Sequence, residues 1–109
     1  MTVVHVCRPV GRLVREIAEK TTGEPPDAIT LGAFVFLFTR PTGEDLARLM
    51  RHERVHVLQA ARFAPRWARW LPETARVWLG TPRFLQSYLD SYRQVGYDNL
   101  FEREARAAE

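Results

Sequence analysis

The chain has 109 residues, a length typical of one domain, and its 46% hydrophobic and 27% charged residues argue against a disordered chain. Fifteen arginines and one lysine against 13 acidic residues give a net charge of +3, which excludes a polycation. The single cysteine, Cys7, excludes an internal disulfide and a cysteine-based zinc cluster. The longest apolar run (31–38) is too short for a transmembrane segment, and the N-terminus lacks the apolar core of a signal peptide. We therefore expect residues 1–109 to form a single soluble, cytoplasmic domain.

The predicted elements follow an order that is typical of an α+β domain with one small sheet. Apolar residues at helical spacing predict helices, whereas β-branched and aromatic runs predict strands. Thr42 and Asp45 resemble a capping box before the central helix, and Asp98 or Asn99 can cap the last helix. In chain order we expect a short strand at 3–7, a helix from Pro9 to Thr22, strands within 28–39 bent at Gly32, a helix at 43–64, a short irregular helical stretch at 67–82, a helix at 82–96 and a final helix at 97–109.

The helix predicted at 43–64 carries titratable groups on its apolar side. Projected at about 100° per residue, Glu53 falls near the middle of the apolar stripe, and His52 and His56 flank that stripe one turn apart. The apolar residues of the stripe are Leu46, Leu49, Met50, Val57, Ala60, Ala61 and Ala64. An ionised carboxylate on a buried face is costly unless something pairs with it. The residues that break the amphipathic pattern are thus those of HERVH, 52–56.

HERVH matches the HExxH pattern, in which two imidazoles at i and i+4 project from one helix face and bind one zinc ion. Glu53 would be the general base that takes a proton from the zinc-bound water, whose pKa the metal lowers to ~7. The resulting hydroxide-like water would attack a carbonyl polarised by the metal, which is what amide hydrolysis requires. The alternative is a surface histidine pair with Glu53 bound to a distant arginine, and the apolar setting of Glu53 argues against it.

A third zinc ligand is needed, because a catalytic zinc usually takes three protein ligands. No histidine follows His56 closely enough for the longer HExxHxxGxxH motif, so an acidic ligand is favoured. The candidates are His5, Cys7, Asp90, Asp98, Glu102 and Glu104. Glu102 also has a structural explanation, because it has capping-box spacing from Asn99 and ion-pair spacing to Arg106. The residues alone leave this choice open.

HERVH together with NLFEREA (99–105) resembles the gluzincin-type zinc metallopeptidases, whose third ligand is a glutamate on a later helix. NLFEREA is similar to the E-x-x-A-D and N-P-x-E-x-E-A segments of that family. The match is closest to the minimal soluble gluzincins and to the catalytic cores of related integral-membrane metallopeptidases, including the heat-shock type. Arg106 stands where the membrane enzymes have an aspartate.

The resemblance implies a minimal zincin-like fold with an N-terminal helix, a small sheet, the HExxH helix and a later helix that bears the glutamate. It implies one Zn²⁺ per chain, held by His52, His56 and Glu102. It further implies supporting residues that orient the ligands. These are Glu104, Asn99, Asp98 and Tyr97, joined by Gln59, because HVLQ is similar to the H-x-x-Q extension of some small bacterial HExxH domains.

Several other side chains have both a structural and a functional interpretation. Tyr88, Tyr92 and Tyr97 could stabilise an oxyanion, although tyrosines at helical spacing are more often core residues. By resemblance, the strand at 33–39 could bind substrate backbone as an added strand, and it also reads as a plain core strand. Cys7 could bind zinc as a thiolate and block the site, but a buried, inert thiol is favoured.

The tryptophans Trp67, Trp70 and Trp78 are expected to lie in the core, and the alternative is a surface for an oligomer or a membrane. Taken together, the residues predict a zinc metalloendopeptidase, weak or latent, that acts on a peptide or protein substrate. One rival is a catalytically silent zinc-binding interaction module. A second, less favoured rival is an arginine-rich nucleic-acid-binding domain without metal.

Overall fold

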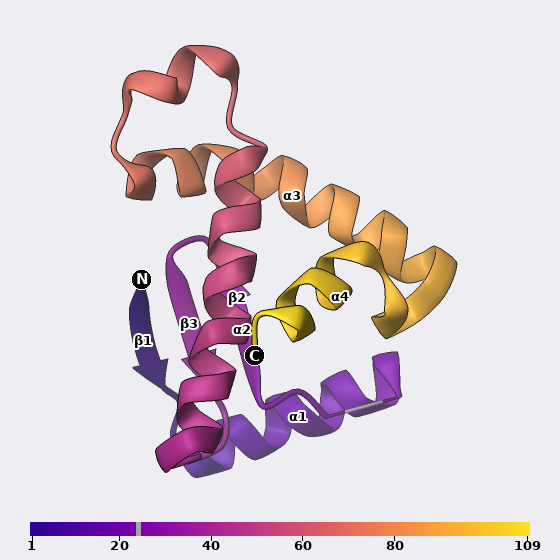
Figure 1. Cartoon of the computed structure of the whole chain (residues 1–109). Coiled ribbons are helices and arrows are strands. Elements are labelled where there is room, and N and C mark those ends of the chain that lie inside the picture. Colours follow the sequence, from indigo (N-terminus) through magenta and orange to yellow (C-terminus); the bar gives the residue numbers. More distant parts are fainter. Residues whose placement is uncertain (24) are drawn as a thin grey trace.

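Helices and a small sheet make up the fold, which belongs to the α+β class (Figure 1). The computed structural model describes residues 1–23 and 25–109, with all side chains in these ranges except those of Thr22 and Tyr97. In chain order the elements are β1 (Thr2–His5), α1 (Arg8–Thr22), β2 (Ala28–Leu31), β3 (Phe34–Leu37), α2 (Gly43–Arg62), the 3₁₀ turn η1 (Arg66–Trp70), α3 (Glu73–Val95), the 3₁₀ turn η2 (Gly96–Asp98) and α4 (Leu100–Ala107).

The sheet has β3 in the middle, parallel to β1 on one side and antiparallel to β2 on the other. A tight turn at Gly32 joins β2 to β3, as the expected bend there predicted. Gly32 has φ +59°, and a Cβ on it would lie 2.2 Å from the ring of Trp78, so a side chain does not fit. Val35 and Leu37 are fully buried, which confirms a core strand within 33–39. However, β3 is the central strand of the sheet. The edge strand that contacts α2 is β2.

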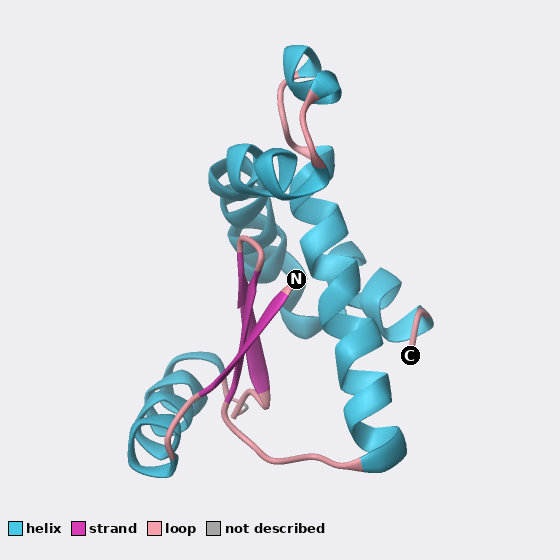
Figure 2. Ribbon diagram, turned by 90° about the vertical axis from the view of Figure 1, so that its left-hand side faces the viewer, coloured by secondary structure: helices cyan, strands magenta, loops and turns pink. Residues whose placement is uncertain are grey.

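α2 is the central helix, with the sheet on one side and α4 on the other, while α3 crosses it (Figures 1 and 2). Val57 and Ala60 of α2 form the core with Val77 and Phe84 of α3. The two backbones touch at Gly80, where a Cβ would lie 1.8 Å from the carbonyl oxygen of Ala60. Only glycine permits this crossing, which places the second half of α3 beside α2.

α3 runs without a break from Glu73 to Val95 and contains Pro82, where separate helical stretches on either side of this residue were expected. A proline inside a helix removes one backbone donor and crowds the carbonyl four residues back. The hydroxyl of Thr81 donates to the carbonyl of Val77 at 2.7 Å, and Gly80 is packed against α2 one residue earlier. Tertiary packing on α2 therefore outweighs the local cost of Pro82.

Three smaller expectations differ from the structure. Thr42 precedes α2 but makes no side-chain cap, so the predicted capping box is absent there, whereas Asn99 caps α4 as expected. Cys7 is exposed rather than buried. Trp67, Trp70 and Trp78 are exposed as well, at 66%, 80% and 40%, and are not buried core residues. Among the described residues, no helix combines the length and the apolar character that crossing a bilayer requires.

Candidate metal centre

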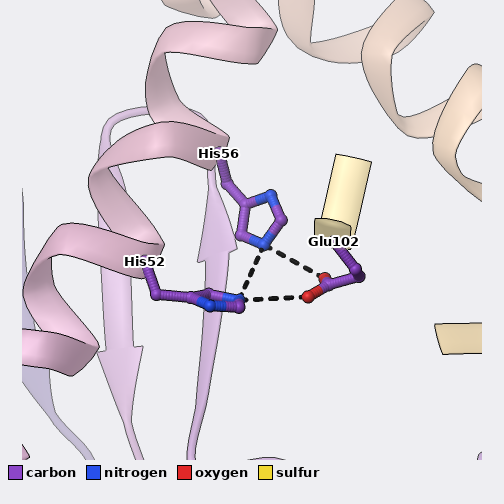
Figure 3. Close-up of side chains that lie close together, drawn as sticks. All are labelled: His52, His56 and Glu102. Carbon is purple, nitrogen blue, oxygen red and sulfur yellow. Dashed lines mark hydrogen bonds and ion pairs between the residues drawn. The ribbon is translucent and has the colours of Figure 1, made fainter. Parts of the chain in front are cut away.

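Two histidines of α2 and one glutamate of α4 meet in space, although 50 residues separate His52 from Glu102 along the chain (Figure 3). His52 Nε2 lies 3.0 Å from Glu102 Oε2, and His56 Nε2 lies 3.1 Å from Glu102 Oε1. The two Nε2 atoms are 3.3 Å apart. One donor atom from each residue thus lies within 4.8 Å of the others. We call these three residues the His–Glu cluster.

The amide of Gln59 determines which nitrogen of His56 carries a proton. Its Nε2 donates to the carbonyl oxygen of Phe101 at 3.0 Å and to Glu104 Oε1 at 3.4 Å, and both partners only accept. The amide oxygen therefore faces His56 Nδ1, at 2.9 Å, and this nitrogen is the donor. A neutral His56 consequently presents the lone pair of Nε2 to the cluster.

Glu109 orients His52 in the same way. Its Oε1 accepts from His52 Nδ1 at 2.7 Å. The backbone oxygen of Glu109 accepts from Nε and Nη2 of Arg51, at 2.9 and 2.7 Å, and Glu44 in turn pairs with Arg51 at 2.8 Å. A carboxylate bound to the outer nitrogen of a histidine is the usual support of a metal-binding imidazole.

Glu102 is held by its backbone and by its side chain. The buried Asn99 accepts from the Glu102 N–H at 3.0 Å, which starts α4 and fixes the position of the carboxylate. The hydroxyl of Tyr88 donates to Glu102 Oε1 at 2.8 Å. Burial acts to raise the pKa of Glu102, but the hydrogen bonds from His52, His56 and Tyr88 outweigh burial and hold this pKa far below 4.5. The carboxylate is therefore ionised at neutral pH.

The His–Glu cluster is rich in hydrogen-bond acceptors, so protons or a cation stabilise it. Two imidazole lone pairs and two carboxylate oxygens face one another, and they need either protons or a cation between them. In the metal-free protein, burial acts to lower the pKa of His52 and His56, but the hydrogen bonds and charge of Glu102 outweigh it and raise both pKa values above 6.5. Two imidazole nitrogens and one carboxylate oxygen are also a donor set that suits Zn²⁺. The residues present therefore fit a zinc ion.

Glu53 lies next to the cluster on the side of the sheet. Its side chain is only 5% exposed, and the hydroxyl of Thr30 in β2 donates to its Oε2. Glu53 lines the same cleft as His52 and His56, and its negative charge acts to raise the pKa values of both imidazoles. The hydrogen bond from Thr30 explains how the apolar side of α2 accommodates an acidic residue.

A cleft of about 500 Å³ gives access to these groups. Its floor includes His52, Glu53 and His56, and the strand β2 forms one wall. The other walls come from α1, α3, α4 and the segment that leads into β2. The residues of these walls include Ala18, Pro26, Ile29, Leu85, Tyr88 and Leu89. Elements that are distant in sequence, α1, β2, α3 and α4, therefore surround one polar floor with largely apolar walls.

The structure separates the remaining candidates for the third ligand from the cluster. Asp98 is exposed and pairs with Arg103, at 2.7 Å, and with Arg106. Asp90 is exposed beside Arg93, and His5 and Cys7 lie exposed around the start of α1. Glu104 touches Gln59 and pairs with Arg62 at 2.8 Å, so it lies behind the cluster rather than in it. The side chain of Tyr97 lies outside the described residues.

Sequence reasoning missed Thr30 and Glu109. Thr30 lies in a predicted strand, and no local pattern in the sequence links it to Glu53, 23 residues later. Glu109 is seven residues after Glu102, a spacing of two turns in the helix predicted at 97–109, although α4 itself ends at Ala107. The hydroxyl of Tyr88, a candidate oxyanion donor, donates to Glu102 in the structure. Tyr92 stacks on Tyr88.

The arginines of the surface are interleaved with carboxylates. Ion pairs within 4.0 Å join Arg15 to Asp27, Arg51 to Glu44, Arg54 to Glu73, Arg62 to Glu104, Arg93 to Asp90 and Arg103 to Asp98. This alternation of sign spreads the positive charge of the chain over the surface.

Comparison of the chain with protein-family models, with curated proteins and with solved structures finds no match.

Proposed function

We propose that the chain is a zinc-dependent metallopeptidase domain of gluzincin type with a zincin-like fold. The observation that carries the proposal is the meeting of His52, His56 and Glu102 on one side of a cleft whose floor also holds Glu53. The hydrogen bonds of Gln59 and Glu109 support it, because they direct both Nε2 lone pairs toward Glu102.

The three residues of the His–Glu cluster would hold the ion, each through one atom. A bound zinc ion supplies a Lewis acid that polarises a carbonyl and makes water more acidic. Glu53 would accept the proton of the attacking water and then pass it to the leaving amine. The hydroxyl of Thr30 would orient the Glu53 carboxylate for this task.

The substrate would lie along β2, in place of the strand at 33–39 that the resemblance suggested. The N–H of Phe38 donates to the carbonyl of Asp27, so these two residues are a hydrogen-bonded pair of the ladder. Because such pairs alternate in an antiparallel ladder, the backbone groups of Ala28 and Thr30 point away from β3. An extended peptide could pair with them at the mouth of the cleft.

The first test is the zinc content of the purified protein beside two matched variants. We expect about one zinc per chain in the wild type, loss of zinc in Glu102→Ala, and retention in Glu104→Ala, because only Glu102 belongs to the cluster. Absence of zinc from the wild type, even after zinc is added back, would contradict the proposal. Equal loss in both variants would show that α4 has unfolded rather than lost a ligand.

The second test separates an enzyme from a silent zinc-binding module. Glu53→Gln keeps the shape of the side chain and removes its basicity. We expect this variant to retain zinc and to cleave a library of fluorogenic peptides 10²- to 10⁴-fold more slowly, roughly the contribution of a general base. If the wild type cleaves none of the peptides, or if the variant cleaves them equally well, the peptidase proposal fails and the module remains.

A further inference from the structure

A protruding turn at one end of the molecule exposes two tryptophans. η1 projects beyond the ends of α2 and α3, at the top of Figures 1 and 2. Trp67 is 66% exposed and Trp70 is 80% exposed, whereas Ala68 between them is completely buried. Pro65 and Pro72 flank the turn, and their fixed φ angles stiffen both of its connections.

The 3₁₀ geometry sorts the side chains of this turn into rows. A 3₁₀ helix has three residues per turn, so residues i and i+3 lie one above the other. Trp67 and Trp70 therefore form one outward row, and Arg66 and Arg69 form a second row beside it. The guanidinium of Arg69 lies 4.9 Å from the ring centre of Trp70. We call these four residues the Trp–Arg tip.

The Trp–Arg tip is positively charged. Arg66 and Arg69 make no ion pair with an acidic side chain of the described residues, whereas seven other arginines do. The acidic groups of the adjoining helices are engaged elsewhere. Glu73 pairs with Arg54 at 3.0 Å, and Glu104 pairs with Arg62 at 2.8 Å.

We propose that the Trp–Arg tip docks on the interface of a bilayer that contains anionic lipids. Indole rings favour the headgroup level, because each has an apolar body and one polar N–H. Each arginine beside them is worth about a fivefold gain in binding near an anionic surface. The proposal does not depend on the peptidase proposal, because the tip lies outside the cleft and contributes no residue to it.

Other partners fit the tip less well. One turn of five residues is far smaller than the roughly 600 Å² or more per partner that a stable protein interface buries. A nucleic-acid strand is normally held in a basic groove with stacking platforms, and the tip is a convex projection instead. A convex point with aromatic side chains and cations can enter a headgroup layer without any complementary shape.

A second exposed apolar feature provides a matched control. Val10, Leu13 and Ile17 form a stripe along α1 and are each at least half exposed. α1 lies at the opposite end of the molecule from η1 (Figures 1 and 2), so one flat membrane cannot contact both. Variants of this stripe also remove exposed apolar surface, but they leave the tip unchanged.

The experiment measures cosedimentation of the full chain with large unilamellar vesicles. These contain 70% phosphatidylcholine and 30% phosphatidylglycerol, with pure phosphatidylcholine vesicles as the comparison. The variants are W67A/W70A, R66Q/R69Q and L13S/I17S, and circular dichroism verifies that each is folded. The four tip positions are exposed, so their substitution leaves the core intact.

We expect the wild type to bind the mixed vesicles, and L13S/I17S to bind them equally. W67A/W70A should bind at least tenfold more weakly, and R66Q/R69Q about thirtyfold more weakly, close to wild type on pure phosphatidylcholine. No binding by the wild type, unchanged binding by W67A/W70A, or loss in L13S/I17S would overturn the proposal. So would a tip-dependent dimer in sedimentation equilibrium or tip-dependent binding to oligo(dT), in the absence of vesicle binding.

Discussion

Glu109 supports His52 from outside the His–Glu cluster, and its removal tests that role. Glu109→Ala leaves His52 Nδ1 without its acceptor, so we expect zinc affinity to fall about 10- to 100-fold. Glu109→Gln should fall less, because the amide oxygen can still accept from Nδ1. Competition with a chromophoric chelator measures both dissociation constants.

The control for this prediction is Glu16→Gln, an exposed position on α1 that should leave zinc affinity unchanged. Equal affinity in the wild type and Glu109→Ala would show that the contact does not orient His52. A fall of the same size in Glu109→Gln as in Glu109→Ala would show that the charge of Glu109, and not its acceptor atom, is what matters.

The sequence alone identifies those site residues that lie on one helix. It does not identify site residues that are distant in sequence and meet only in the folded chain. His52, Glu53 and His56 stand out because they violate the apolar pattern of α2. The structure brings Glu102 to these histidines, the position that the resemblance implied. Thr30 and Glu109 belong to no motif, so only the tertiary structure brings them to the site.

Gly80 is the element-level feature on which the crossing of α2 and α3 depends. A methyl group there would lie 1.8 Å from the carbonyl oxygen of Ala60, so Gly80→Ala must push the helices apart. We expect a loss of about 3 kcal/mol in the free energy of unfolding, at the upper end of overpacking costs. Chemical denaturation of the metal-free protein measures it.

Gly11→Ala is the matched control, since Gly11 is also helical but its added Cβ would lie 3.4 Å from the nearest atom, the carbonyl oxygen of Phe38. The gain in helix propensity of about 1 kcal/mol should make this variant neutral or more stable. If Gly80→Ala were as stable as Gly11→Ala, the two backbones would not be in contact at this crossing.

The elements themselves could be predicted where local signals agree. The turn at Gly32, the helix from Gly43 and the Asn99 cap follow from glycine, periodicity and capping rules. The course of α3 could not, because the packing that carries it across Pro82 involves α2 and is invisible in a local window. The exposure of Trp67 and Trp70 could not be predicted for a related reason. A large apolar side chain is expected in the core, and only the tertiary structure shows that these two side chains remain exposed.

At the scale of the whole molecule, we expect the His–Glu cluster to make both stability and zinc binding depend on pH. The stability that the histidines give the metal-free fold should fall as pH rises, whereas zinc binding should strengthen. In the metal-free protein the raised pKa values of His52 and His56 stabilise the fold fully below 6.5, and this contribution is lost as pH rises through the folded values. The lowered pKa of Glu102 stabilises the fold above 4.5, and this contribution is lost as pH falls through the folded value. The metal-free protein should gain most from the cluster between these limits.

Zinc binding should instead strengthen as pH rises, because the metal displaces protons from both imidazoles. Thermal unfolding from pH 4 to 8, with and without zinc, measures the two profiles. We expect the increase in Tm caused by zinc to be small near pH 5 and large near pH 8. An increase that is independent of pH would show that zinc binds elsewhere than at the histidines.

Held as proposed by Glu102 of α4, a zinc ion would also be a removable cross-link between distant parts of the chain. His52 and Glu102 are 50 residues apart, and tying such a loop takes on the order of 4 kcal/mol of chain entropy out of the unfolded ensemble. α4 has only eight residues, too few to remain helical without contacts to the rest of the fold. When the ion leaves, α4 should be the first helix to detach, which hydrogen exchange at its amides would report. Zinc supply would thereby set how long a copy of the chain survives proteolysis.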